Sequence, residues 1–180
     1  MTKKMKIGDI IISNDELTSR IDELADQINN DYKDSKDEMV LLGILKGCFV
    51  FMSDISRRLK GDIIIDFMQV SSYGNGTEST GNIKIIKDTS INLEGKDVLI
   101  IEDIVDSGNT LSKLTKILEE KNPKSVRVCA LLSKPSRRQV EFEADYTGFE
   151  IPDKFIIGYG LDCDEKFREL PYIAEVIIEG

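Results

Sequence analysis

The chain has no histidine among its 180 residues. This absence excludes Ser-His-Asp and Cys-His nucleophile systems, and it also excludes zinc sites built on histidine. Any acid–base chemistry must therefore use carboxylate, lysine, tyrosine or cysteine side chains.

Cysteine is scarce. Cys48, Cys129 and Cys163 are scattered along the chain, odd in number and without metal-ligand spacing, so a reducing compartment is the simplest interpretation. Cys48 and Cys129 have apolar neighbours and are expected in the core. Cys163 lies in a polar segment, and whether it is sensitive to oxidation stays open.

Long apolar runs and an excess of positive charge are missing as well. No run approaches the ~20 apolar residues that span a bilayer, and the start of the chain lacks the apolar stretch of a signal peptide. We therefore expect a cytoplasmic protein without a membrane partner. The net charge of −9 argues against a nucleic-acid partner. It does not exclude an anionic small substrate, because local cations and a metal can outweigh the overall charge.

Apolar runs of strand length alternate with helical periodicity. A helix is expected over Leu17 to Ile28, with Ser13 and Glu16 as a capping box at its start. Two more helices are indicated by Phe51, Ile55 and Leu59, and by Leu111, Leu114 and Leu118. Strands are expected over residues 39–45, 62–70, 83–87, 97–102, 125–132 and 154–159, with 172–178 closing the sheet.

This order predicts an α/β fold with a mostly parallel central sheet flanked by helices, in one domain over residues 1–180. Ligands bind beyond the carboxyl ends of the strands in such sheets. The informative loops are therefore 46–47, 102–110, 133–135 and 160–168.

The strongest signal is the segment 98–111, in which a buried strand runs into acidic residues, a turn and a helix. Backbone N–H groups of such a turn and of the helix start can bind an anion. Gly108 has no side chain, so the backbone can approach the anion closely. Glu102 and Asp103 place two carboxylates at the mouth of this turn, where they can accept hydroxyl hydrogens or attract Mg²⁺. This set fits a sugar 5-phosphate, although a solvated strand-to-helix loop with a simple cap has the same residue types.

The segment 98–111 resembles the phosphoribosyl pyrophosphate motif of the type I phosphoribosyltransferases. Residues 148–170 are similar to the purine-binding end of the hypoxanthine-guanine branch, and residues 41–59 and 71–81 to its pyrophosphate loop and mobile lid. The resemblance covers nearly the whole chain in the right order. It implies the fold of the type I phosphoribosyltransferases, with a small hood formed by the terminal segments and a mobile lid loop.

The resemblance assigns roles to the acidic loop. Glu102 and Asp103 would bind the ribose hydroxyls and help to fix Mg²⁺, and Asp106 would be the general base on the purine. The 5-phosphate would be held by Asp106, Ser107, Gly108, Asn109 and Thr110. Asn109 departs from some relatives, which have lysine there, so the role of its side chain stays open.

The other motifs receive roles in the same way. Lys46, Gly47 and Arg168 would bind pyrophosphate, and in the family the peptide bond before that lysine can be cis. Ser72 and Tyr73 would close over the site as part of the lid.

The purine would be recognised by a further set. Lys134 would donate to its six-oxygen, Phe155 would stack on its ring, and the Ile156 backbone would contact its edge. Asp162 would reach a second Mg²⁺ through water. Each of these positions also has a plain structural interpretation: a surface lysine, a core side chain or a solvated turn.

The resemblance implies purine salvage, with phosphoribosyl pyrophosphate and hypoxanthine or guanine giving IMP or GMP and pyrophosphate in a homodimer or homotetramer. The ranking of hypoxanthine, guanine and xanthine stays open. A dinucleotide enzyme and a P-loop NTPase lack their glycine motifs here. A phospho-acceptor domain would carry its acidic pair after the first strand. A phosphoribosyl pyrophosphate-sensing regulator and a transferase for another base are the remaining alternatives.

Overall fold

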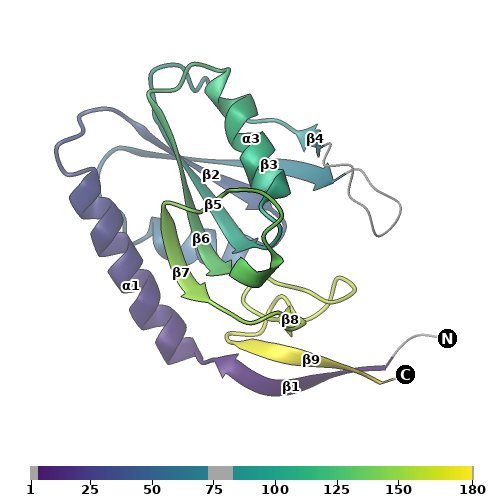
Figure 1. Cartoon of the computed structure of the whole chain (residues 1–180). Coiled ribbons are helices and arrows are strands. Elements are labelled where there is room, and N and C mark those ends of the chain that lie inside the picture. The colour runs from purple at the N-terminus through teal and green to yellow at the C-terminus, as the bar shows by residue number, and fades with distance from the viewer. Residues whose placement is uncertain (1–3, 73–82, 180) are drawn as a thin grey trace.

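The computed structural model describes residues 4–72 and 83–179, which form two sheets (Figure 1). The strands of the six-stranded sheet are, in spatial order, β4 (Ile83–Lys87), β3 (Ile63–Ser72), β2 (Met39–Leu45), β5 (Asp97–Val105), β6 (Ser125–Ser133) and β7 (Tyr146–Glu150). All neighbours in this sheet run parallel except β3 and β4. The predicted α/β class with a mostly parallel sheet is confirmed.

Helices cover both faces of this sheet. Helices α1 (Asn14–Asp31) and α2 (Phe49–Ser56) pack on one face, and α3 (Asn109–Glu119) packs on the other. The capping box predicted for the first helix is present, with Ser13 and Glu16 bonded to each other's backbone N–H groups. It satisfies donors that the first turn leaves unpaired. The apolar face predicted for α1 is buried along its whole length.

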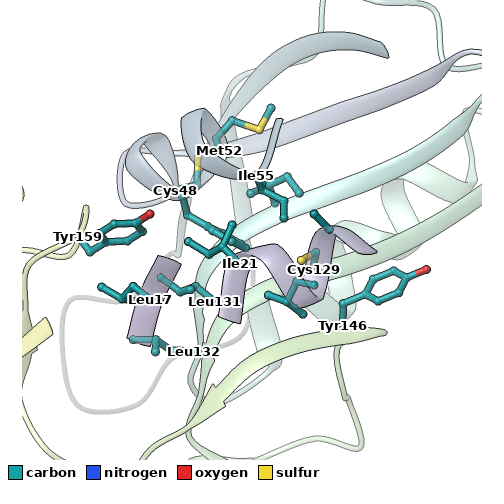
Figure 2. Close-up of a cluster of buried hydrophobic side chains, with 14 of the residues drawn as sticks. Leu17, Ile21, Cys48, Met52, Ile55, Cys129, Leu131, Leu132, Tyr146 and Tyr159 are labelled. Atoms are coloured by element: carbon teal, nitrogen blue, oxygen red, sulfur yellow. The ribbon is translucent and has the colours of Figure 1, made fainter. Parts of the chain in front are cut away.

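The core between α1, α2 and the sheet is continuous (Figure 2). Leu17 and Ile21 of α1 belong to the same buried cluster as Met52 and Ile55 of α2 and Leu131 of β6. Cys48 and Cys129 are fully buried in this cluster, which confirms their predicted place. The three cysteines are free thiols, and Cys163 is half-buried.

The second sheet joins the two ends of the described chain. It is antiparallel, and its order is β1 (Lys4–Ile12), β9 (Ile173–Glu179), β8 (Ile156–Ile157). The expected hood of terminal segments is confirmed. The prediction that 172–178 closes the central sheet is wrong, because β9 pairs with β1 and β8 instead. An apolar strand pattern identifies a strand but carries no information about its partner.

Several boundaries differ from those predicted. Strand β5 continues to Val105, so Glu102 and Asp103 lie within the strand. The strand predicted over 154–159 is only Ile156–Ile157 in the structure, where the chain turns at Gly158 with a φ of 97°. It pairs with β9 in the second sheet, so its predicted place in the central sheet is wrong. Of the predicted lid, residues 71–72 end β3, and Tyr73 lies outside the described residues. None of the helices in the described ranges is long and apolar enough to cross a bilayer.

Candidate active site

A cavity of about 260 Å³ opens at the carboxyl end of β5. Its walls come from the ends of β2, β3 and β5 and from the turn into α3: Ile44, Val70, Glu102, Ile104, Val105, Asp106, Ser107, Gly108, Thr110 and Leu111. Gly108 has a φ of 81° and stands at the start of α3, a backbone conformation that glycine adopts without steric cost. The predicted phosphate-loop residues thus line one hollow, with the exception of Asn109. The Asn109 amide instead donates to the Gln139 side chain at 2.7 Å.

Glu102 and Asp103 form a carboxylate pair at this end of β5, in which Glu102 is buried and Asp103 is half-buried. Glu102 is 9% exposed and lines the cavity. Burial and the Asp103 carboxylate raise the pKa of Glu102 well above its ordinary value, and burial likewise raises the pKa of Asp103. Two adjacent carboxylates, of which one is buried, oppose each other's ionisation. A cation placed beside them would relieve that opposition.

The predicted pyrophosphate residues meet on the other side of Asp103. The Leu45–Lys46 peptide bond is cis, and Gly47 lies so close to Asp103 that a Cβ on Gly47 would be 1.5 Å from its carboxylate. Arg168 donates to the Gly160 carbonyl at 2.9 Å and pairs with Asp162 at 2.9 Å. The structure therefore brings the predicted residues of loops 46–47 and 160–168 together.

The predicted purine residues lie beside the end of β6. The Lys134 ammonium donates to the Lys154 carbonyl at 2.7 Å, and the Lys134 side chain is only 11% exposed. Phe155 is 74% exposed, whereas Ile156 is buried in β8. The interpretation as a core side chain therefore holds for Ile156 and not for Phe155.

Comparisons with known proteins agree with this arrangement. Residues 10–164 match the family model of the phosphoribosyl transferase domain. The hypoxanthine phosphoribosyltransferase of Salmonella typhimurium is 49% identical over 170 residues, which cover 94% of this chain and 96% of the relative. The chain belongs to the phosphoribosyltransferase family.

Solved structures of this family share the whole fold. A hypoxanthine-guanine phosphoribosyltransferase from Bacillus anthracis is 45% identical, with a TM-score of 0.90, and the match covers 97% of this chain and 99% of that one. A hypoxanthine phosphoribosyltransferase from Staphylococcus aureus is 44% identical, with a TM-score of 0.91 over 95% and 92% of the two chains. Within the phosphoribosyltransferases this chain falls in the hypoxanthine branch, and it is an enzyme of purine salvage.

Sequence reasoning missed three charged residues at this phosphoribosyltransferase site. Glu165 pairs with Lys46 at 2.8 Å and with Arg168 at 3.3 Å, although its acidic run looks like a solvated turn. Arg137 pairs with Asp106 at 3.1 Å and with Asp153 at 3.4 Å. Arg138 follows it and is almost buried. The only signal for the arginines was their place beside Lys134, at the carboxyl end of a strand.

The carboxylates do not gather into a complete metal cage. Within residues 4–72 and 83–179 no group of three or more histidine, cysteine or acidic residues is arranged to hold a metal ion. Glu102 and Asp103 are a pair, and Asp162 is engaged with Arg168. One or two carboxylates are what Mg²⁺ uses when substrate phosphates and water complete its shell.

The contact of Gly47 with Asp103 leads to a first prediction. In Gly47→Ala the new methyl group displaces the Asp103 carboxylate, so we expect activity to fall by about tenfold or more, the scale for misplaced reacting groups. Steady-state kinetics and thermal unfolding would be measured together. Gly61→Ala is the control, because a Cβ there meets nothing within 4 Å but is strained at φ +109°. It should lose stability and keep activity, whereas unchanged activity in Gly47→Ala would contradict the contact.

Proposed function

We propose that this chain transfers the phosphoribosyl group from phosphoribosyl pyrophosphate to hypoxanthine or guanine, giving IMP or GMP and pyrophosphate. One observation carries the proposal. Asp106 lines the phosphate cavity and is joined through Arg137 to Asp153, which also pairs with Lys134 at 3.5 Å. Successive ion pairs thus connect the loop proposed to bind phosphate with Lys134, the proposed donor to the six-oxygen of the purine.

In this reaction a purine ring nitrogen displaces pyrophosphate from the anomeric carbon of the ribose. Asp106 accepts the proton that the ring nitrogen loses, and the turn 106–110 holds the 5-phosphate. Lys46 and Arg168 donate to the departing pyrophosphate. Both cations pair with Glu165, Lys46 at 2.8 Å and Arg168 at 3.3 Å, so they lie beside the same carboxylate. No covalent enzyme intermediate is required.

Mg²⁺ fits the donor set and is part of the proposal. Glu102 and Asp103 would bind the ribose hydroxyls and help to hold one Mg²⁺ ion. Asp162 would reach a second Mg²⁺ ion through water. When bound, the ion neutralises charge on the pyrophosphate. The raised pKa values of Glu102 and Asp103 support this role, because their mutual repulsion is a cost that a divalent cation offsets.

The purine would lie between Lys134 and Phe155. Lys134 donates to its six-oxygen, the exposed ring of Phe155 stacks on it, and the Ile156 backbone contacts its edge. Phe155 is exposed, whereas the next residue, Ile156, is buried and begins β8 of the second sheet, so the ring directly precedes a strand that is held in place. Stacking on such a ring is tolerant of substituents, which leaves selection to the polar contacts.

The assembly is also proposed. Residues 1–180 act as one phosphoribosyltransferase domain, the protein forms a homodimer or homotetramer, and its other partners are small-molecule substrates. Several large apolar side chains are exposed, among them Ile65 and Ile86 on β3 and β4. Sedimentation equilibrium tests the assembly, and a monomer at micromolar concentration would contradict it.

The reaction itself is tested by product stoichiometry. Purified protein is mixed with hypoxanthine, phosphoribosyl pyrophosphate and Mg²⁺, and IMP and pyrophosphate are quantified together. We expect equal amounts of both, and none when EDTA removes the metal. Release of pyrophosphate without nucleotide, or no turnover at all, would overturn the proposed function.

A second prediction concerns Lys134. A buried donor rejects a purine without its acceptor, so kcat/KM for adenine should fall below that for hypoxanthine by a factor on the order of 10⁴. Lys134→Met should lower kcat/KM for hypoxanthine by about 10- to 100-fold, the scale of a lost charged hydrogen bond. Lys96→Met, before β5 at the other end of the sheet, is the matched control. Efficient use of adenine by the native protein would contradict the role of Lys134.

A further inference from the structure

The back of the phosphate loop is held by a short segment after β6, residues 134–139, which we call the rear strap. The Val105 carbonyl accepts from the Lys134 backbone N–H and from the Arg138 guanidinium, each at 2.9 Å. The Asp106 carbonyl also accepts from Arg138. The Ser107 carbonyl accepts from the Gln139 backbone N–H at 2.9 Å. Three consecutive carbonyl groups of the loop are therefore fixed from one side.

This pinning determines where the N–H groups of the loop point. In a trans peptide unit the carbonyl and the following N–H point in opposite directions. Carbonyls of 105, 106 and 107 turned to the rear strap thus turn the N–H groups of 106, 107 and 108 away from it. No acceptor for these three N–H groups is found among the residues that the structure describes. The cavity lies on that free side, since its walls come from β2, β3, β5 and the loop, and none from the strap.

Arg138 is the central part of the rear strap. Its side chain is only 11% exposed. Besides the two loop carbonyls, its guanidinium donates to Ser133 Oγ at 2.6 Å and to the Phe142 carbonyl at 3.0 Å, and it pairs with Glu143 at 3.3 Å. A planar fork with five donors can satisfy acceptors in several directions at once, which a lysine ammonium on a flexible stem cannot reproduce.

Arg138 also packs against the glycine of the loop. A Cβ built on Gly108 would lie 3.2 Å from Arg138 Cδ. The arginine therefore supports the loop by contact as well as by hydrogen bonds. Its charge and its aliphatic stem face the loop from behind, so it has no direct path to a ligand in the cavity.

We infer that Arg138 is a positioning residue that holds the backbone N–H groups of residues 106–108 in place for the 5-phosphate of the sugar substrate. The inference rests on the proposed function and adds a residue to it. A loop that is preformed for its ligand avoids the entropic cost of ordering on binding. The ligand chemistry is a phosphate monoester, and ribose 5-phosphate presents it without the pyrophosphate.

The test is Arg138→Lys, which keeps the charge and loses the fork. We expect the Kd of ribose 5-phosphate by calorimetry and the KM of phosphoribosyl pyrophosphate to rise by about tenfold or more, the scale of lost preorganisation. The KM of hypoxanthine at saturating phosphoribosyl pyrophosphate should change by less than about threefold. The substitution affects the backbone that binds the phosphate and not the contacts of the base. Ser133→Ala, which removes one acceptor of the guanidinium, should shift the same two constants in the same direction by less.

Arg127→Lys is the matched control for a merely structural role. Arg127 lies at the other end of β6 and donates to the Tyr146 hydroxyl at 2.9 Å, so its replacement should lower the thermal midpoint and leave both KM values unchanged. Folded Arg138→Lys and Ser133→Ala with wild-type affinity for ribose 5-phosphate, or with equal losses for both substrates, would overturn the inference. Failure of the wild-type protein to bind ribose 5-phosphate and make nucleotide would instead overturn the proposed function. This outcome is measured on the wild-type protein alone, so the two failures can be told apart.

Discussion

Replacement of Asp106 by asparagine is expected to lower kcat by about a hundredfold or more, the usual scale for loss of a general base. Asparagine keeps the size and shape of the side chain and removes only the proton acceptor. Affinity for phosphoribosyl pyrophosphate should change little, because in the proposed site the phosphate is held by the loop backbone rather than by this carboxylate. The two quantities are measured by steady-state kinetics and by calorimetry with the sugar substrate.

The ion pair between Asp106 and Arg137 provides the control for this experiment. Asp106→Asn also weakens that pair, which joins the side chains at 3.1 Å. Arg137→Gln breaks the same pair and leaves the carboxylate in place, so it should keep most of kcat. If both variants lost kcat equally, the effect would come from the ion pair. A near-wild-type kcat in Asp106→Asn would remove Asp106 as the base, and a collapse of sugar binding with intact chemistry would make it a phosphate-loop residue only.

The second large effect is expected at the carboxylate pair. Glu102→Ala combined with Asp103→Ala should weaken binding of the sugar substrate at limiting Mg²⁺ by at least about tenfold, the lower end of what altered metal surroundings cost. The reason is that two adjacent acceptors for hydroxyl groups and metal are lost together. Wild-type kinetics of the double variant at limiting Mg²⁺ would contradict the assignment of this strand end.

The same pair predicts a pH dependence of stability. The pKa of Glu102 in the folded protein lies well above the ordinary value of 4.5, so the folded state holds its proton to higher pH than the unfolded state does. Stability therefore decreases as the pH rises above 4.5 toward the raised pKa of the folded protein. Glu102→Gln removes this titration. Without metal it should unfold at a higher temperature than wild type at pH 7, and at about the same temperature at pH 4. Equal midpoints at pH 7 would contradict the raised pKa of the buried Glu102 beside Asp103.

The sequence predicted well those elements whose own apolar pattern indicates that they are buried. Strand β2 has an unbroken apolar run and α3 a repeat of three leucines, and both lie where they were expected. Strand β9 was assigned to the wrong sheet because its partner β1 comes from the other end of the chain. Pairing between such distant segments has no local signature.

The candidate site shows the same division. The loops 46–47 and 102–110 were predicted because ligands bind beyond the carboxyl ends of the strands in an α/β sheet, whereas loop 160–168 follows β8 of the second sheet. Arg138 escaped detection because most of its acceptors are backbone carbonyls, which every residue has. Glu165 was missed because its partners Lys46 and Arg168 come from two loops. Only the folded chain shows that this one carboxylate pairs with both cations.

The most direct test of the account is the native protein's choice of base. Steady-state kcat/KM is measured with hypoxanthine, guanine, xanthine, adenine, uracil and orotate at fixed phosphoribosyl pyrophosphate and Mg²⁺. We expect hypoxanthine or guanine to be the best substrate. Adenine and both pyrimidines should be poorer by a factor on the order of 10⁴, because none of them offers Lys134 a purine six-oxygen. Preference for adenine or a pyrimidine, or no transfer to any base, would contradict it.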